Sequence, residues 1–189
     1  MLSATDPITW TPQRIAVAGT SGAGKTSLAC RVAEDLDLPR VEIDSLHHGP
    51  GWRRRESFAA DVELFISGDR WVIEHQYRDV RPMIAARADT LLWLDYPNWF
   101  TLQRLIRRTV HRRLTRQELW NGNHEAPLHT IFTDENHIIR WGIRTRNTLR
   151  PVMPTLEERF PGLRVVRFRR PREAENWLAA LIRSVRSGE

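Results

Sequence analysis

One short segment constrains the fold of this chain more than any other part of the sequence. Residues 19–26 read Gly-Thr-Ser-Gly-Ala-Gly-Lys-Thr and fit the pattern G-x-x-x-x-G-K-[ST]. An apolar run, RIAVAG at 14–19, comes directly before the segment, and Leu28, Val32 and Leu36 follow it at helical spacing. The sequence therefore predicts a buried strand, a glycine-rich turn and a helix in direct succession.

The residue types in this segment predict a phosphate-binding loop. Glycines let successive backbone N–H groups turn inward around phosphate oxygens, and the positive end of the helix dipole favours the same negative charge. Lys25 is expected to reach the β- and γ-phosphates of a nucleotide, and the Thr26 hydroxyl to ligate Mg²⁺. A glycine turn without a ligand would need neither side chain, and Lys25 is the only lysine among 29 basic residues. The predicted phosphate contacts are Gly19, Ser21, Gly22, Ala23, Gly24, Lys25, Thr26 and Ser27.

Strand and helix patterns alternate along the rest of the chain. This alternation predicts a three-layer α/β/α fold, with a parallel sheet of about five strands and ligands at the carboxyl ends of the strands. The predicted strands are 14–19, 40–44, 70–74, 90–95 and 163–168, and the predicted helices are 25–36, 57–66, 80–87, 98–113, 132–149 and 172–185. Residues 1–12 are expected to form an arm, 13–189 a single domain, and the aperiodic segment 114–130 a small lid inserted in it.

Length and composition exclude several other classes of protein. With 189 residues, of which 41% are hydrophobic and 28% charged, the chain can bury one core and differs from disordered sequences. No apolar run reaches the roughly 18 residues of a membrane span, and a single cysteine cannot form an internal disulfide. We therefore expect a cytoplasmic protein with no membrane partner. The net charge of +6 raises the expectation of an anionic partner.

A second motif follows the fourth predicted strand. Leu94-Asp95-Tyr96-Pro97 ends this strand, and Arg104 and Arg108 lie one turn apart on the next predicted helix. Residues at i and i+4 share a helix face, and a pair of guanidinium groups suits the charge of a transferring phosphoryl group. A solvated basic face is the alternative, because further arginines crowd the same stretch at 107, 112, 113 and 116.

Together these motifs resemble the nucleoside monophosphate kinase-like group of P-loop proteins. Within that group, residues 13–185 look most similar to the adenylate kinase-like topology modulation proteins. The resemblance implies the kinase branch of the P-loop NTPase fold, with ATP and Mg²⁺ as cofactors. It also implies transfer of the γ-phosphoryl group of ATP to a nucleotide or another small molecule. The residues that it marks as catalytic are Lys25, Asp44, Arg104 and Arg108, and both arginines are expected to contact ATP.

The same resemblance places the acceptor near the ends of the second and third predicted strands. It implies a substrate- or metal-organising role for Asp44, which could orient or deprotonate a hydroxyl, whereas a phosphate acceptor would need no base. Glu74-His75 stands where the family has Asp-Gly, and Glu74 can still hold a Mg²⁺-bound water. The predicted metal-binding residues are Thr26 and Glu74. The predicted acceptor contacts are Asp44, Trp52, Glu74, Arg78, Arg81, Arg140 and Arg144.

Two further interpretations stay open. Arg140 and Arg144, after the lid, either close over the phosphates or are ordinary surface residues, and Trp120, His124 and His129 of the lid are candidates for substrate contact. A different class of function is a nucleotide-dependent module that binds DNA or protein and has weak ATPase activity. The pI near 10.7 favours that class, whereas the sequence contains no nucleic-acid-binding motif. The acceptor, the choice between ATP and GTP and the oligomeric state are not defined by the sequence.

Overall fold

A computed structural model describes residues 1–187, and within them five strands form one parallel sheet in the order β1-β5-β4-β2-β3. The strands are β1 (Leu2–Ser3), β2 (Arg14–Gly19), β3 (Trp71–Glu74), β4 (Thr90–Leu94) and β5 (Arg164–Phe168). The α-helices are α1 (Lys25–Asp35), α2 (Ile43–His47), α3 (Phe58–Ile66), α4 (Arg81–Arg87), α5 (Asn98–Leu114), α6 (Ile138–Thr145), α7 (Leu156–Arg159) and α8 (Pro171–Ser187). Short 3-10 helices are η1 (Pro50–Trp52), η2 (Trp120–Gly122), η3 (Leu128–Phe132) and η4 (Met153–Thr155).

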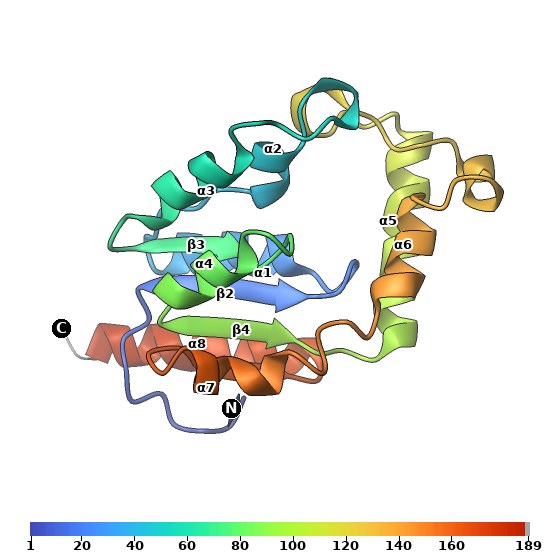
Figure 1. Ribbon diagram of the computed structural model, residues 1–189. Helices are drawn as coiled ribbons and strands as arrows, with labels where there is room; N and C mark the ends of the chain where they lie inside the picture. The colour runs from blue at the N-terminus through green and yellow to red at the C-terminus, as the bar shows by residue number, and fades with distance from the viewer. Residues whose placement is uncertain (188–189) are drawn as a thin grey trace.

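Different helices cover the two faces of the sheet (Figure 1). Side chains along β2 alternate between these faces, as they must in a strand. Ile15 and Val17 pack with α1 and α8, whereas Ala16 and Ala18 pack with α3, α4 and α7. All four side chains are fully buried. The predicted three-layer α/β fold with a five-stranded parallel sheet is thereby confirmed.

The membership of the sheet differs from the prediction at one edge. Residues 40–44 were expected to form a strand, but Arg40 makes only an isolated bridge to Val72, and α2 begins at Ile43. Pro39 lacks a backbone donor, and its carbonyl accepts the N–H of Val72 (2.8 Å). The Ile43 N–H then turns to the Glu74 carboxylate (3.2 Å), which starts a helical turn instead of a ladder. Asp44 therefore lies in the first turn of α2 and not at the end of a strand.

The fifth strand of the sheet, β1, lies at the opposite edge from the one predicted. The arm predicted for residues 1–12 is part of the fold, because Leu2 and Ser3 pair in parallel with Val166 and Arg167 of β5. Two residues are too few to give a periodic pattern, so the sequence carried no strand signal here. The prediction of about five strands was correct, and the identity of one strand was wrong.

The helix predicted over 132–149 is also shorter than expected. Residues 128–132 form η3, and α6 begins only after His137, whose ring Nδ1 accepts the N–H of Ile139 (3.3 Å). This cap marks the start of the helix, and irregular turns follow its end at Thr145. Among residues 1–187, none of the helices combines the length and the apolar content that crossing a bilayer requires.

Helices α5 and α6 stand together across the carboxyl ends of the strands (Figure 1). Their close packing depends on Gly142 of α6, where a Cβ atom would lie 2.4 Å from Leu105 Cδ2 of α5. Leu105 itself is fully buried. The segment between the two helices, predicted as a lid, crosses from α5 toward α2 and η1 and returns to α6. The sheet, α5 and the lid thus surround the region in which the residues of the predicted site lie.

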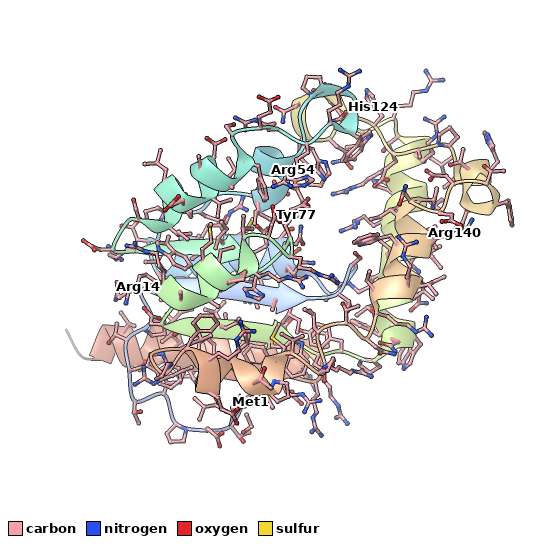
Figure 2. The ribbon with its side chains drawn as sticks, in the orientation of Figure 1. Met1, Arg14, Arg54, Tyr77, His124 and Arg140 are labelled. Atoms are coloured by element: carbon pink, nitrogen blue, oxygen red, sulfur yellow. The ribbon has the colours of Figure 1, made fainter. Side chains whose placement is uncertain are left out.

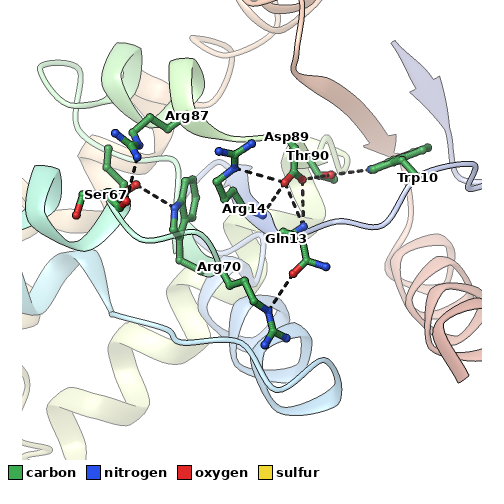
Figure 3. Close-up of polar contacts among 10 residues, drawn as sticks. Trp10, Gln13, Arg14, Ser67, Arg70, Arg87, Asp89 and Thr90 are labelled. Carbon is green, nitrogen blue, oxygen red and sulfur yellow. Dashed lines mark hydrogen bonds and ion pairs between the residues drawn. The ribbon is translucent and has the colours of Figure 1, made fainter. Parts of the chain in front are cut away.

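Asp89 connects neighbouring strands by hydrogen bonds at the amino end of the sheet (Figure 3). Its carboxylate accepts hydrogen bonds from the backbone N–H groups of Gln13 (3.1 Å) and Arg14 (2.8 Å) and from the Thr90 hydroxyl (2.8 Å). The Thr90 hydroxyl in turn accepts the indole N–H of Trp10 (2.8 Å). One side chain therefore ties the start of β2 to the start of β4, at the end of the sheet opposite the predicted loop.

Replacing Asp89 by alanine is expected to lower the free energy of unfolding by about 2–3 kcal/mol, because two backbone donors and a hydroxyl lose a charged acceptor. Urea unfolding followed by circular dichroism measures this loss. Asp69→Ala, which removes an exposed carboxylate outside this network, is the matched control and should change stability by less than about 0.5 kcal/mol. Equal stability of the two variants would contradict the assignment.

Candidate active site

The predicted phosphate-binding loop connects β2 to α1 and has the backbone that its glycines predict. Gly22 and Gly24 have φ values of 83° and 97°, in the left-handed region that favours glycine. A Cβ atom at Gly22 would lie 2.2 Å from the carbonyl oxygen of Thr101, so only glycine lets α5 approach the loop this closely. The loop is therefore held between the sheet and α5.

Lys25 begins α1 and points its ammonium group along the loop. Its Nζ lies 3.4 Å from the carbonyl oxygen of Thr20. Burial lowers the pKa of Lys25 to about 8, Asp44 and Glu74 oppose this shift, and Arg108 and Arg81 add to it. Burial is thus the main reason that the charged form of Lys25 is disfavoured, and the two carboxylates compensate for it only in part. A bound phosphate would remove that penalty.

A cavity of about 370 Å³ joins the loop to α2 and to α5. This volume lies in the range of small-molecule sites. Of the predicted site residues, it brings together Gly22, Gly24, Lys25, Thr26, Ser27, Asp44, Arg104 and Arg108. The cavity is completed by Glu42, Gln76, Arg112 and Trp120. Predicted site residues from three separate motifs therefore share one cavity, in which the nucleotide motif and Asp44 both form part of the wall.

Three arginines of α5 line this cavity at intervals of one turn. Arg104 lies beside the loop, with its Nη2 atom 3.4 Å from the position of a Cβ on Gly24. Arg112, at the far end, is paired with Glu125 of the lid (3.5 Å) and lies over the Trp120 ring (5.8 Å). Within the described residues Arg104 and Arg108 form no salt bridge. These two guanidinium groups are available to a ligand.

Asp44 is held by donors on one of its two carboxylate oxygens. The Gln76 amide donates to Oδ1 (2.5 Å), and the Tyr77 hydroxyl donates to the same oxygen (2.6 Å). Both donors follow β3, so the end of this strand fixes the carboxylate of α2. Neither Gln76 nor Tyr77 was identified from the sequence, because amide and phenol groups carry no motif at this spacing.

Glu74 and His75 do not line the cavity. Glu74 is 2% exposed, its Oε2 holds the N–H of Ile43, and its Oε1 has no hydrogen-bond partner. Burial raises the pKa of Glu74. Burial and Arg81 lower the pKa of His75 to about 3, so this buried ring is neutral. The His75 ring, 2% exposed, therefore takes up no space in the cavity.

Several predicted site residues lie outside the cavity wall. Gly19 and Ala23 pack against the core side of the loop, and Ala23 uses its N–H on the Thr20 carbonyl (3.1 Å). Arg144 covers the Trp141 ring (5.1 Å), and the Trp52 indole donates to the His124 carbonyl (3.2 Å). The predicted site residues that do not line the cavity are Gly19, Ser21, Ala23, Trp52, Glu74, Arg78, Arg81, Arg140 and Arg144.

The lid is docked on the loop that contains Trp52. Asn123, 4% exposed, accepts the Trp52 backbone N–H (2.9 Å) and donates to the Gly49 carbonyl (2.9 Å). Asn121 donates to the carbonyls of Ser45 (3.3 Å) and His48. Figure 2 shows His124 at this junction, above Arg54 and Tyr77. The sequence signal for this contact is the pair of asparagines around Gly122, in a segment otherwise without periodicity.

The residues present suit a nucleotide with Mg²⁺. The Thr26 hydroxyl lies in the cavity wall beside Lys25, and Mg²⁺ commonly takes few protein ligands because phosphates and waters supply the rest. Within residues 1–187 no group of three or more His, Cys, Asp or Glu side chains is arranged to hold a metal ion. A magnesium ion here would therefore depend on the nucleotide for most of its ligands.

The sheet order and the loop between β2 and α1 match the fold of the small P-loop kinases. Solved structures with this fold include a gluconokinase from Sinorhizobium meliloti 1021, with TM-score 0.51 and 18% identity over 93% of this chain and 95% of that one. Another is shikimate kinase from Acinetobacter baumannii in complex with shikimate, with TM-score 0.54 and 17% identity over 94% of each chain. No family model and no curated protein matches the sequence.

Nucleotide affinity is expected to fall as the pH rises above about 8, the pKa of Lys25 in the free protein. The phosphates favour the charged lysine, so binding raises this pKa and takes up a proton wherever the free lysine is neutral. Affinity should therefore drop by up to about tenfold per pH unit over that range.

Calorimetry with ADP·Mg²⁺ from about pH 7 to about pH 9.5, in two buffers of different ionisation enthalpy, measures both the affinity and the proton uptake. Lys25→Arg keeps its charge over this range and serves as the control, because its affinity should show no such slope. A flat profile for the wild-type protein would show that Lys25 does not contact the phosphates.

Proposed function

We propose that this chain is an ATP-dependent kinase that transfers the γ-phosphoryl group of ATP to a hydroxyl group of a small molecule. The observation that carries the proposal is the single cavity that Lys25 and Thr26 share with the Asp44 carboxylate. A nucleotide-binding loop alone would suit many P-loop proteins. A carboxylate held by two donors in the same cavity adds a group that can accept a proton from a hydroxyl.

Electrostatics favour a hydroxyl over a phosphate acceptor. Two negative charges about 5 Å apart repel by about 3 kcal/mol at an effective dielectric constant near 20. A phosphate next to Asp44 would need a cation of its own, because the proposal assigns Lys25, Arg104 and Arg108 to the phosphates of ATP and the third lining arginine, Arg112, already has an acidic partner. Arg112 pairs with Glu125, Arg54 with Asp79 and Arg55 with Asp61. A neutral acceptor has no such requirement.

The division of roles follows from the geometry. The loop residues and Lys25 hold the β- and γ-phosphates, and Arg104 and Arg108 neutralise the charge that spreads over the transferring group. Mg²⁺, when bound, would neutralise phosphate charge from the Thr26 side. Asp44 accepts the hydroxyl proton while the new P–O bond forms and ADP departs. Docking of the lid limits the access of water to this space.

Other parts of the sequence hypothesis remain proposals. They are the closer likeness to the adenylate kinase-like topology modulation proteins, the domain boundaries, and the acceptor or metal roles of Trp52, Glu74, Arg78, Arg81, Arg140 and Arg144. Glu74 supports the site in a different way from a ligand, because its Oε2 positions the N–H next to Asp44. Arg78 is exposed, and Arg81 keeps a buried Nε atom without a partner.

Formation of ADP from ATP·Mg²⁺ is expected to rise strongly with one acceptor from a panel of sugars, polyols, hydroxy acids and nucleosides, compared with nucleoside monophosphates. Lys25→Ala should abolish this stimulation. Asp44→Asn should lower kcat by about 10²–10⁴-fold, the usual contribution of a general base, with nucleotide affinity nearly unchanged. Stimulation by nucleoside monophosphates alone would reject the hydroxyl acceptor. Stimulation by none, with tight ATP binding, would favour a nucleotide-dependent binding module.

Arg108→Ala tests the role of the arginine row. We expect kcat to fall by about 10²–10³-fold and ATP affinity by much less, because the guanidinium group acts mainly on charge in the transition state. Arg107→Ala is the matched control on the same helix, since Arg107 is exposed and does not line the cavity. Equal losses of turnover and of ATP affinity in Arg108→Ala would assign this residue to ground-state binding.

A further inference from the structure

Tyr77 occupies an unusual position directly after β3. Its φ value is 59°, in the left-handed region that a side chain other than glycine rarely adopts. Such a residue persists only where its surroundings hold it in place. The Tyr77 ring stacks on His47, with centroids 3.8 Å apart and planes within 10°, and meets the edge of Phe58 at 5.2 Å. Two aromatic side chains, His47 of α2 and Phe58 of α3, thus hold the phenol in place.

The phenol connects Asp44 to two histidines. Its oxygen lies 2.6 Å from Asp44 Oδ1 and 3.0 Å from His48 Nε2, and His48 Nδ1 lies 3.3 Å from His47 Nδ1. Burial, with a smaller contribution from His48, lowers the pKa of His47 to about 4, and burial also lowers the pKa of His48. Both rings are therefore neutral at neutral pH and carry one N–H each.

Asp44, Tyr77, His48 and His47 thus form a hydrogen-bonded series, and the chemistry of the groups assigns its donors and acceptors. An ionised carboxylate only accepts, so the Tyr77 hydroxyl donates to Asp44 and must accept from His48. The His48 proton is then assigned to Nε2, and His48 Nδ1 faces His47 Nδ1. Tautomers are inferred from hydrogen-bond partners in this way. The series runs from His47 to His48, to Tyr77 and to Asp44 without a break.

We propose that Tyr77 is a positioning residue, which with His48 holds Oδ1 of Asp44 and thereby directs Oδ2 toward the acceptor. The inference rests on the proposed function for its catalytic consequence and on geometry alone for the series itself. Oδ1 is occupied by Tyr77 and Gln76, so a hydroxyl entering the cavity meets the other oxygen. His48 also stacks on Trp120 at 6.1 Å, which brings the lid into contact with the series.

The series can be tested without any enzymatic activity. The chain has two tyrosines, so labelling with tyrosine carrying ¹³C at Cζ gives two resonances, assigned by Tyr77→Phe and Tyr96→Phe. Asp44→Ala and His48→Phe should each shift the Tyr77 resonance and leave the Tyr96 resonance in place. An unchanged Tyr77 resonance in Asp44→Ala would overturn the proposal, whatever the acceptor of the enzyme proves to be.

Kinetics with the acceptor identified above test the consequence. Tyr77→Phe keeps the ring and its packing, and we expect kcat to fall about 10- to 100-fold with the KM for ATP unchanged, as for a misplaced catalytic group. His48→Phe keeps the ring on Trp120 and should lower kcat less. Tyr96→Phe removes the same hydroxyl from a phenol in the other core cluster and should leave kcat unchanged.

The double variant Tyr77→Phe/His48→Phe decides whether His48 acts through Tyr77. Because its only path to Asp44 in the proposal is the phenol, the double variant should lose no more turnover than Tyr77→Phe alone. Thermal unfolding verifies that each variant is folded. Wild-type turnover in Tyr77→Phe, or losses that multiply in the double variant, would overturn the positioning role. A lack of turnover with every acceptor, together with the expected ¹³C shifts, would instead reject the proposed function and retain the series.

Discussion

The close approach of α5 to Gly22 is the contact on which the site depends. The Thr101 carbonyl occupies the space that a Cβ atom at residue 22 would need, so the helix can touch the loop only because that residue is glycine. Once α5 is anchored there, its geometry places every fourth residue on the same side. Arg104, Arg108 and Arg112 therefore follow from one backbone contact. The same logic applies at Gly142, which lets α6 close against α5.

Two loops, the lid and the loop that contains Trp52, form the far wall of the cavity and are joined by hydrogen bonds. The backbone groups of Gly49 and Trp52 bond to Asn123, and the carbonyl of His48 bonds to Asn121. Backbone groups left without hydrogen-bond partners at this junction would cost free energy. We therefore expect the lid and the Trp52 loop to move as one body.

The sequence predicted best those features that depend on local chemistry. Gly22, Gly24, Lys25 and Thr26 follow one another along the chain, so their pattern defined the loop and the flanking strand and helix. Asp44 was expected at the correct edge of the sheet, but as the end of a strand. A long-range hydrogen bond from the Ile43 N–H to Glu74 turns this segment into a helix instead.

Contacts between distant segments left little trace in the sequence. β1 has two residues and depends on β5 for its pairing, and Tyr77 reaches Asp44 across 33 positions. Neither can be read from periodicity, since each is defined by the fold that surrounds it. The arginines of α5 show the same difference between local patterns and contacts between distant segments. Their spacing on α5 was visible, whereas the acidic partner of Arg112 in the lid became apparent only in three dimensions.

The distribution of charge supports the proposal of an anion beside the loop and a neutral acceptor beside Asp44. Around Lys25, burial disfavours the charged lysine, Asp44 and Glu74 compensate in part, and Arg108 and Arg81 add smaller opposition, so the charged form lacks full compensation in the free protein. An incoming polyphosphate relieves that imbalance, which adds to the binding energy of the loop N–H groups. Around Asp44 the donors are a phenol and an amide, which fix the carboxylate without neutralising it. In the proposed function, the Asp44 carboxylate, held by neutral donors, is the base at the point where the transferred group arrives.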